Sequence, residues 1–111
     1  TNEHQLIQYR KYRPRVIEPG VCPTLTYNMG AGGHNVPFFY SKKNDCFQKL
    51  SVAQCLSLQG FPDRFSFPEK LTNAAKYRMI GNAVSPKVSE LIADQIMSAL
   101  KELKNEPKLA V

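Results

Sequence analysis

The clearest hydrophobic pattern lies near the end of the chain. From Pro86 onward, apolar residues recur every three or four positions and share one face of a helix, with charged residues elsewhere. Ser85 followed by Pro86 favours a helix start, because the hydroxyl can cap the first turn and the proline ring fits the first helical position. The pattern predicts a helix that ends near Lys104, then a loose tail over 105–111. The apolar positions are Val88, Leu91, Ile92, Ile96, Ala99, Leu100 and Leu103.

Two shorter helices are predicted before it. The first spans 52–59, because Ser51 and Gln54 have the spacing of a reciprocal capping box and Gly60 is a typical helix end. The second spans 73–80 and ends before Gly81, since glycine reaches positive φ and lets a ligand approach the backbone. Gly81 and Asn82 are therefore predicted to form a hinge that presents main chain and one carboxamide to a ligand.

The first half of the chain is rich in strand-forming residues and turn signals. Residues 5–12 are polar and aromatic and include several strand-forming residues, and residues 13–17 are predicted to be extended. Short strands are predicted at 22–27 and 36–40. The glycine-rich residues 28–35 lie between these two strands and predict a hairpin-like loop whose main chain is exposed to contact. The fold class expected is α+β, with short strands first and helices after.

Length and composition limit the possible architecture. The chain has 111 residues, of which 42% are hydrophobic and none is Trp, so we expect one small domain with a modest core. It begins with Thr1 instead of Met, which favours a processed product or a fragment. No apolar run is long enough for a membrane span and no leader pattern is present, so a cytoplasmic protein is expected.

Charge and cysteine content indicate which kinds of partner and site the chain can have. The net charge is +6, and the first 49 residues hold seven of the fifteen Lys and Arg but three of the nine acidic residues. This favours a polyanion such as nucleic acid, although a solvated basic face has the same composition. Cys22, Cys46 and Cys55 are an odd number without Cys-x-x-Cys spacing. They favour reduced packing thiols, with neither a zinc site nor a disulfide framework.

Three segments in order carry a family resemblance. Residues 22–37 begin Cys-Pro-Thr-Leu-Thr and continue into the glycine loop, 49–63 end Leu-Gln-Gly-Phe-Pro-Asp, and 77–86 contain Gly-Asn-Ala-Val-Ser-Pro. Over about residues 9–104 the chain resembles the C-terminal part of the DNA (cytosine-5) methyltransferases. In that family these segments are the end of the target recognition domain, followed by the ninth and tenth motifs.

The resemblance implies a division of the chain. Residues 1–49 would be the C-terminal part of the recognition domain, 50–104 a helical segment that completes the catalytic domain, and 105–111 a tail. The last helix would dock on a doubly wound α/β methyltransferase sheet. That sheet would belong to a separate catalytic subunit or to a missing N-terminal portion of the same chain.

The resemblance also implies binding residues. Asn82, Ala83 and Val84 would line the S-adenosylmethionine site, with the Asn82 amide toward the amino-acid end of the cofactor; stabilisation of the turn is the alternative role for Asn82. A threonine hydroxyl would meet a phosphate of double-stranded DNA and help to hold a flipped nucleotide. The expected DNA-binding residues are Arg13, Arg15, Thr24, Leu25, Thr26, Asn28, Gly30, Gly32, Gly33 and His34. For the two arginines and the histidine, a solvated charge or a turn-stabilising side chain is the alternative.

The chain departs from the family pattern in one place. Gln48, Gln54 and Ser57 stand where Arg, Glu and Arg are common in the ninth motif. Neutral groups would therefore replace a charged network that orients the recognition domain. The fold itself should not depend on this network.

No catalytic residue is predicted. Attack on cytosine needs a thiolate, supplied in this family by a Pro-Cys pair, whereas Cys22 precedes Pro23. The family's acidic motif and glycine-rich cofactor loop are also missing. The chain alone should be inert, acting instead as the DNA-reading and cofactor-site-completing part of an enzyme of a bacterial restriction-modification system, in the nucleoid. The alternatives are a non-catalytic nucleic-acid-binding module and part of a tRNA-methylating relative.

Overall fold

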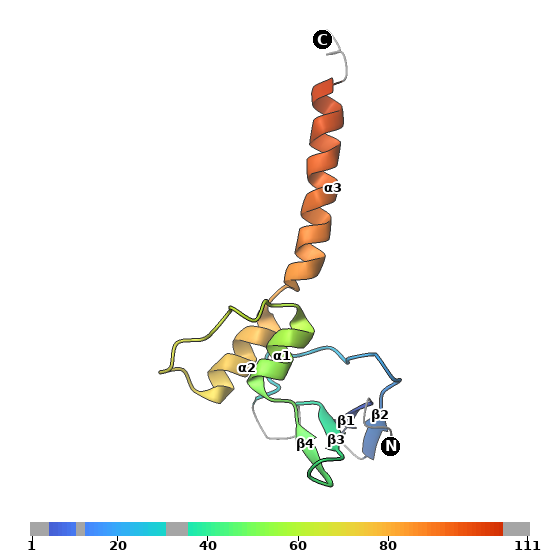
Figure 1. The fold of residues 1–111 in the computed structure, drawn as a ribbon, viewed down its shortest axis with the longest axis vertical. Helices are drawn as coiled ribbons and strands as arrows, with labels where there is room; N and C mark the ends of the chain where they lie inside the picture. The colour runs from blue at the N-terminus through green and yellow to red at the C-terminus, as the bar shows by residue number, and fades with distance from the viewer. Residues whose placement is uncertain (1–4, 11–12, 31–35, 106–111) are drawn as a thin grey trace.

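The computed structural model describes residues 5–10, 13–30 and 36–105. In these ranges a sheet of short strands is followed by helices (Figure 1), which confirms the α+β class and its order along the chain. The elements are β1 (Leu6–Arg10), β2 (Arg13–Val16), β3 (Phe38–Ser41), β4 (Cys46–Lys49), α1 (Val52–Gln59), α2 (Asn73–Asn82) and α3 (Pro86–Asn105).

The sheet is antiparallel and has the strand order β2-β1-β3-β4. β1 pairs with β2 up to Arg10 opposite Arg13, and Ile7 of β1 lies opposite Phe38 of β3. β1 thus lies in residues 5–12, where strand-forming residues are common, the predicted extended segment at 13–17 contains β2, and the strand predicted at 36–40 overlaps β3. β4 was not predicted because its side chains are mostly exposed and show no apolar alternation.

The strand predicted at 22–27 is wrong, and with it the hairpin around the glycine loop. Residues 21–26 belong to no strand, and β3 pairs instead with β1 and β4. In this segment Leu25 is buried while Thr24 and Thr26 are exposed. The backbone of this segment lies against helix α2 through Gly81, so a helix occupies the place of a partner strand.

Helix α1 confirms the prediction from its caps. The Ser51 side chain accepts a hydrogen bond from the Gln54 main-chain N–H at 3.1 Å, and the Ser51 N–H donates to Gln54 Oε1 at 2.8 Å. Gly60 has a left-handed conformation with φ of 99°, and its N–H donates to the Leu56 and Ser57 carbonyls. Satisfying these terminal groups fixes both ends of α1.

Helix α2 differs from the prediction at its end. It continues through Gly81 to Asn82 and leaves the helical conformation at Ala83 (φ −73°, ψ 148°). Among the described residues, glycines with positive φ are found at positions 20 and 60, so the predicted Gly81 hinge is wrong. Glycine is required there because a Cβ would overlap the main chain of Thr26 and Tyr27. The close approach that the sequence suggested is made by the protein's own backbone.

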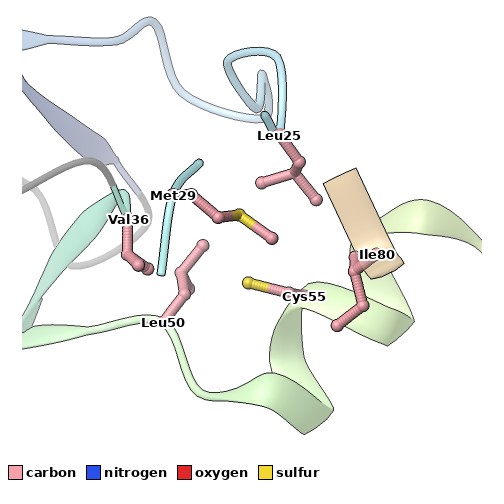
Figure 2. Close-up of a cluster of buried hydrophobic side chains, with 6 residues drawn as sticks. All are labelled: Leu25, Met29, Val36, Leu50, Cys55 and Ile80. Carbon is pink, nitrogen blue, oxygen red and sulfur yellow. The ribbon is translucent and has the colours of Figure 1, made fainter. Parts of the chain in front are cut away.

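A hydrophobic cluster among the described residues holds the loops and the first two helices together (Figure 2). Its buried members are Leu25, Met29, Val36, Leu50, Cys55 and Ile80. They come from both sides of the expected boundary at residue 49, so the recognition segment and the helical segment share one core. Figure 2 shows that these side chains, brought by loop residues, α1 and α2, converge on one interior space.

Helix α3 extends away from this body (Figure 1). Its start at Pro86 confirms the prediction, and it continues to Asn105. Among its twenty residues, all of them described, none is buried, and Leu91 and Leu103 are 66% and 65% exposed. No helix in the described ranges is both long enough and apolar enough to cross a membrane.

Candidate functional site

The expected cofactor residues form the connection between α2 and α3. We call Asn82, Ala83 and Val84 the α2–α3 turn. The Ala83 N–H donates to the Ile80 carbonyl at 3.2 Å, closing the end of α2. Asn82 is exposed and Val84 is 71% exposed, whereas Ala83 is half-buried. The turn therefore holds its middle residue inward and presents a carboxamide and an apolar side chain on the surface.

Gln59, the last residue of α1, binds this turn directly. Its Nε2 donates to the Ile80 carbonyl and to the Ala83 carbonyl, each at 3.0 Å. The last carbonyls of a helix lack the regular helical partner. Gln59 therefore adds a second donor to the Ile80 carbonyl, which also accepts from the Ala83 N–H, and supplies a donor to the Ala83 carbonyl. Sequence reasoning did not find this role, because a glutamine before a glycine cap gives no sign of acceptors more than twenty residues away.

The helix end at Gly60 lies against the beginning of α3. A Cβ at Gly60 would come within 2.9 Å of Lys87 Cγ and 3.5 Å of Ser85 Oγ. Glycine here serves both the left-handed cap and the close packing. The α2–α3 turn is thus bordered by Gln59 before it and by the Gly60 contact after it.

The opposite side of α2 lies on the expected DNA-binding segment. Gly81 contacts the main chain of Thr26 and Tyr27, and a Cβ on Gly30 would come within 2.9 Å of Tyr77 Cβ. The Tyr77 hydroxyl donates to the Leu50 carbonyl at 2.7 Å. Because Gly81 is adjacent to Asn82, these contacts place the expected cofactor turn next to the expected DNA segment.

The structure distributes the expected DNA-binding residues in three ways. Thr24, Thr26 and Asn28 are exposed, and Thr26 Oγ1 donates to Asn28 Oδ1 at 2.7 Å. Leu25 lies in the core and Gly30 packs against α2, so neither places an apolar or side-chain group at the surface. The remaining positions, Gly32, Gly33 and His34, lie outside the described residues.

The two arginines of β2 lie apart from the threonines in the sequence but are equally exposed. Arg13 and Arg15 occupy alternate positions of a strand, so their side chains leave the sheet on the same face. β2 is an edge strand of the sheet. Both arginines therefore remain available to an anionic partner, and their contact with DNA stays a prediction.

Two of the thiols, those of the buried Cys55 and the partly buried Cys22, are held in the protonated form. Burial raises the pKa of Cys55 to about 11, and burial also raises the pKa of Cys22. The thiolate is the nucleophilic form of cysteine, so these two side chains act as packing groups at neutral pH. Within the described ranges, no cluster of three or more His, Cys, Asp or Glu is placed to hold a metal ion.

Comparison with known proteins gives one consistent family. Residues 4–98 match the family model described as C-5 cytosine-specific DNA methylase. The type II methyltransferase M.Bsp6I of Bacillus sp. (strain RFL6) is 38% identical over 100 residues, which are 90% of this chain and 31% of that protein.

Two further relatives match shorter stretches. M.FnuDI of Fusobacterium nucleatum is 34% identical over 68 residues, covering 61% of this chain and 20% of that protein. M.NgoMIV of Neisseria gonorrhoeae is 44% identical over 54 residues, covering 49% and 17%. No solved structure gave a significant match. The chain therefore spans about a third or less of the curated relatives that it matches.

Proposed function

The chain belongs to the C-5 cytosine-specific DNA methylase family, and on that premise we propose that it reads DNA and completes the cofactor site of a type II methyltransferase. The complete enzyme transfers a methyl group from S-adenosylmethionine to carbon 5 of cytosine in a specific duplex sequence. This chain contributes binding groups to the reaction, and the rest of the enzyme contributes the nucleophile.

The contact of Gly81 with Thr26 and Tyr27 is the observation that supports this role most directly. It places a turn with an exposed carboxamide beside a segment with two exposed hydroxyls. A carboxamide offers both donors and acceptors to the amino and carboxylate groups of an amino acid, and a threonine hydroxyl can donate to a phosphate oxygen. Asn82 thus orients the cofactor and Thr24 donates to the DNA backbone, while the Thr26 hydroxyl, which donates to Asn28, can contact DNA by exchanging that partner.

The cofactor supplies an electrophilic methyl group when it is bound. The residues of this chain hold and orient it: Val84 gives apolar surface and Asn82 gives hydrogen-bonding groups, both exposed on the α2–α3 turn. The half-buried Ala83 keeps the turn attached to the body through its hydrogen bonds to α2 and to Gln59. A pocket wall of this kind is incomplete without a second surface opposite it.

Helix α3 supplies the attachment to that second surface. Its apolar face lies open to solvent and is made by Val88, Leu91, Ile92, Gln95, Ile96 and Ala99. The occupant is the portion of the methyltransferase that corresponds to the remaining two thirds of relatives such as M.Bsp6I, of which this chain covers 31%. Burial of this face would contribute roughly 25 cal/mol per Å² of apolar area.

Reassembly tests the proposal. The part of M.Bsp6I that lies outside its match to this chain is co-expressed with the chain, and methyl transfer from labelled S-adenosylmethionine to duplex DNA is measured. Transfer should require both parts. Ile92→Asp together with Ile96→Asp should prevent co-purification, because both side chains are more than half exposed on α3 and carboxylates would be buried in the interface. Methyl transfer by the chain alone would contradict the proposal.

A second variant separates the cofactor role from the DNA role. Asn82→Ala should weaken S-adenosylmethionine binding by the reassembled enzyme, with DNA affinity unchanged, because Asn82 is an exposed residue of the turn. Thr24→Val is the matched control on the DNA segment and should have the opposite effect. Loss of DNA binding alone in Asn82→Ala would favour a nucleic-acid-binding module without a cofactor.

A further inference from the structure

We propose that Gln59 is a positioning residue that fixes the main chain of the α2–α3 turn in the form that receives the cofactor. The inference rests on the proposed function, in which this turn faces S-adenosylmethionine. Gln59 itself need not touch the cofactor. It acts through the carbonyl groups of Ile80 and Ala83, to which its Nε2 donates at 3.0 Å each.

The two acceptors lie on either side of the residue that the turn presents. Ile80 precedes Asn82 by two positions and Ala83 follows it directly, so one carboxamide spans the point where the helix ends. An amide nitrogen has two N–H groups and can donate to two acceptors at once. Since Ala83 has an extended conformation (ψ 148°), its carbonyl leaves the helix axis, and the second hydrogen bond selects that direction.

Gln59 can position the turn because it is itself held in place. It ends α1 beside Gly60, whose left-handed N–H donates to the carbonyls of Leu56 and Ser57. The side chain is partly buried between the helices. From the other side, Gly81 rests on the main chain of Thr26 and Tyr27. The turn therefore lies between a rigid backbone contact and a side chain that supplies hydrogen bonds.

The consequence of removing these hydrogen bonds is a looser turn. The Ala83 carbonyl would lose its donor from Gln59, the Ile80 carbonyl would keep only the Ala83 N–H of its two donors, and Ala83 would be free to sample other backbone directions. A ligand that needs one conformation must then order the turn as it binds, which lowers its affinity. We expect Gln59→Met, which keeps the length of the side chain but removes the donors, to act in this way.

The first measurement uses the 111-residue chain without any ligand. The hydrogen-exchange rate of the Ala83 amide, which donates to Ile80, is measured by NMR. It is expressed as a ratio to the exchange rate of the Gly60 amide. In Gln59→Met this ratio should rise about tenfold, the loss expected for one to two ordinary hydrogen bonds. Gln54→Ala is the control: it breaks the capping box of α1 and should raise both exchange rates without changing the ratio.

The second measurement uses the reassembled methyltransferase. Gln59→Met should raise the Kd and the KM for S-adenosylmethionine about tenfold, with the KM for DNA unchanged. Gln59→Glu adds a pH signature. As a carboxylate, the new side chain of this variant would face two carbonyl oxygens and should weaken S-adenosylmethionine binding more than methionine does. The protonated acid can donate one hydrogen bond, so part of the affinity for the cofactor should return at low pH.

The outcomes separate the two proposals. If the wild-type assembly binds no S-adenosylmethionine, the proposed function fails, and the exchange ratio still reports whether Gln59 holds the turn. If the wild type binds the cofactor and Gln59→Met binds it equally well, with the Ala83 exchange ratio unchanged, the positioning role is overturned. Should Gln59→Met not fold, Gln59→Glu compared at low and neutral pH gives the same decision.

Discussion

The body of the molecule and helix α3 use the same kind of residue in opposite ways. Ile80, in α2, is 1% exposed, whereas Ile96, in α3, is 55% exposed. Both lie on the apolar side of a helix, so their difference reflects what each helix packs against. An amphipathic pattern shows that a helix has a partner surface. It does not show that the surface belongs to the same chain, and for α3 the described residues provide none.

The largest expected effect tests this difference with one substitution at two sites. Ile80→Ala should lower the free energy of unfolding by about 3 to 4 kcal/mol, because it leaves a cavity in a closed core. Ile96→Ala should change it by less than about 0.5 kcal/mol, since its site is exposed. Urea denaturation of the isolated chain measures both. Equal losses would mean that α3 is covered in solution, and repeating the experiment at two protein concentrations would show whether a second copy covers it.

The next effect concerns the packing of α2 on the threonine segment. Gly81→Ala should lower the free energy of unfolding by about 3 kcal/mol, because the added methyl would meet main-chain atoms that cannot move aside as a side chain can. Gly20→Ala is the matched control. Gly20 has φ of 77° with no atom near the added Cβ, so only backbone strain remains, at about 1 kcal/mol. Thermal and urea unfolding should rank the two variants in this order.

The elements that could be predicted from the sequence are those with local signals. Helix α1 begins at the capping box of Ser51 and Gln54 and ends at Gly60, and the hydrogen bonds of these three residues all join groups a few positions apart. The start of α3 is likewise local, since it depends on Ser85 and Pro86. Local hydrogen bonds of this kind do not depend on the rest of the fold.

The parts that could not be predicted depend on contacts between distant residues. Thr24 to Thr26 alternate as a strand would, but their neighbour is α2. Gly81 was predicted to let a ligand approach its backbone, but the group that approaches it is the main chain of Thr26. Gln59 gave no signal at all, because its acceptors are 21 and 24 residues away. Pairwise distances of this kind are not encoded in periodicity or capping.

The candidate site shows the same division. The position of the α2–α3 turn followed from the family motif, and the structure places Asn82 and Val84 at the surface. The motif also suggested Leu25 as a DNA-binding residue, whereas its side chain is part of the core. A motif marks a segment, but the alternation of inward and outward side chains decides which of its residues a ligand can reach.

Alkaline pH should lower the free energy of unfolding because one thiol is buried in the core. The pKa of Cys55 rises from about 9 to about 11 by burial, so the folded state keeps a proton that the unfolded state loses. The stability contributed by this group is complete below pH 9 and is lost as the pH rises toward 11, by on the order of 2 kcal/mol. Burial also raises the pKa of Tyr77, which acts in the same direction.

Urea denaturation between pH 7 and pH 11 measures this loss. Cys55→Ala should be less stable at pH 7, because it removes a buried side chain, but its stability should fall less steeply above pH 9. Ser57→Ala is the control, since Ser57 is exposed on α1 and carries no group that titrates between pH 7 and pH 11, so its removal should leave the slope unchanged. If the free energy of unfolding of Cys55→Ala falls with pH as steeply as that of the wild type, the loss of stability at alkaline pH comes from other groups.

The smallest effect compares helix capping in the body with a similar change on α3. Ser51→Ala removes the acceptor of the Gln54 N–H and should lower the free energy of unfolding by about 1 kcal/mol. Ser89→Ala, in the exposed first turn of α3, should change it by less than about 0.5 kcal/mol. The capping loss appears in the cooperative transition because α1 contributes Cys55 to the core, while α3 contributes no residue to it. A loss of 1 kcal/mol in Ser89→Ala would show that α3 folds as part of the body, and that its apolar face is covered before any second chain arrives.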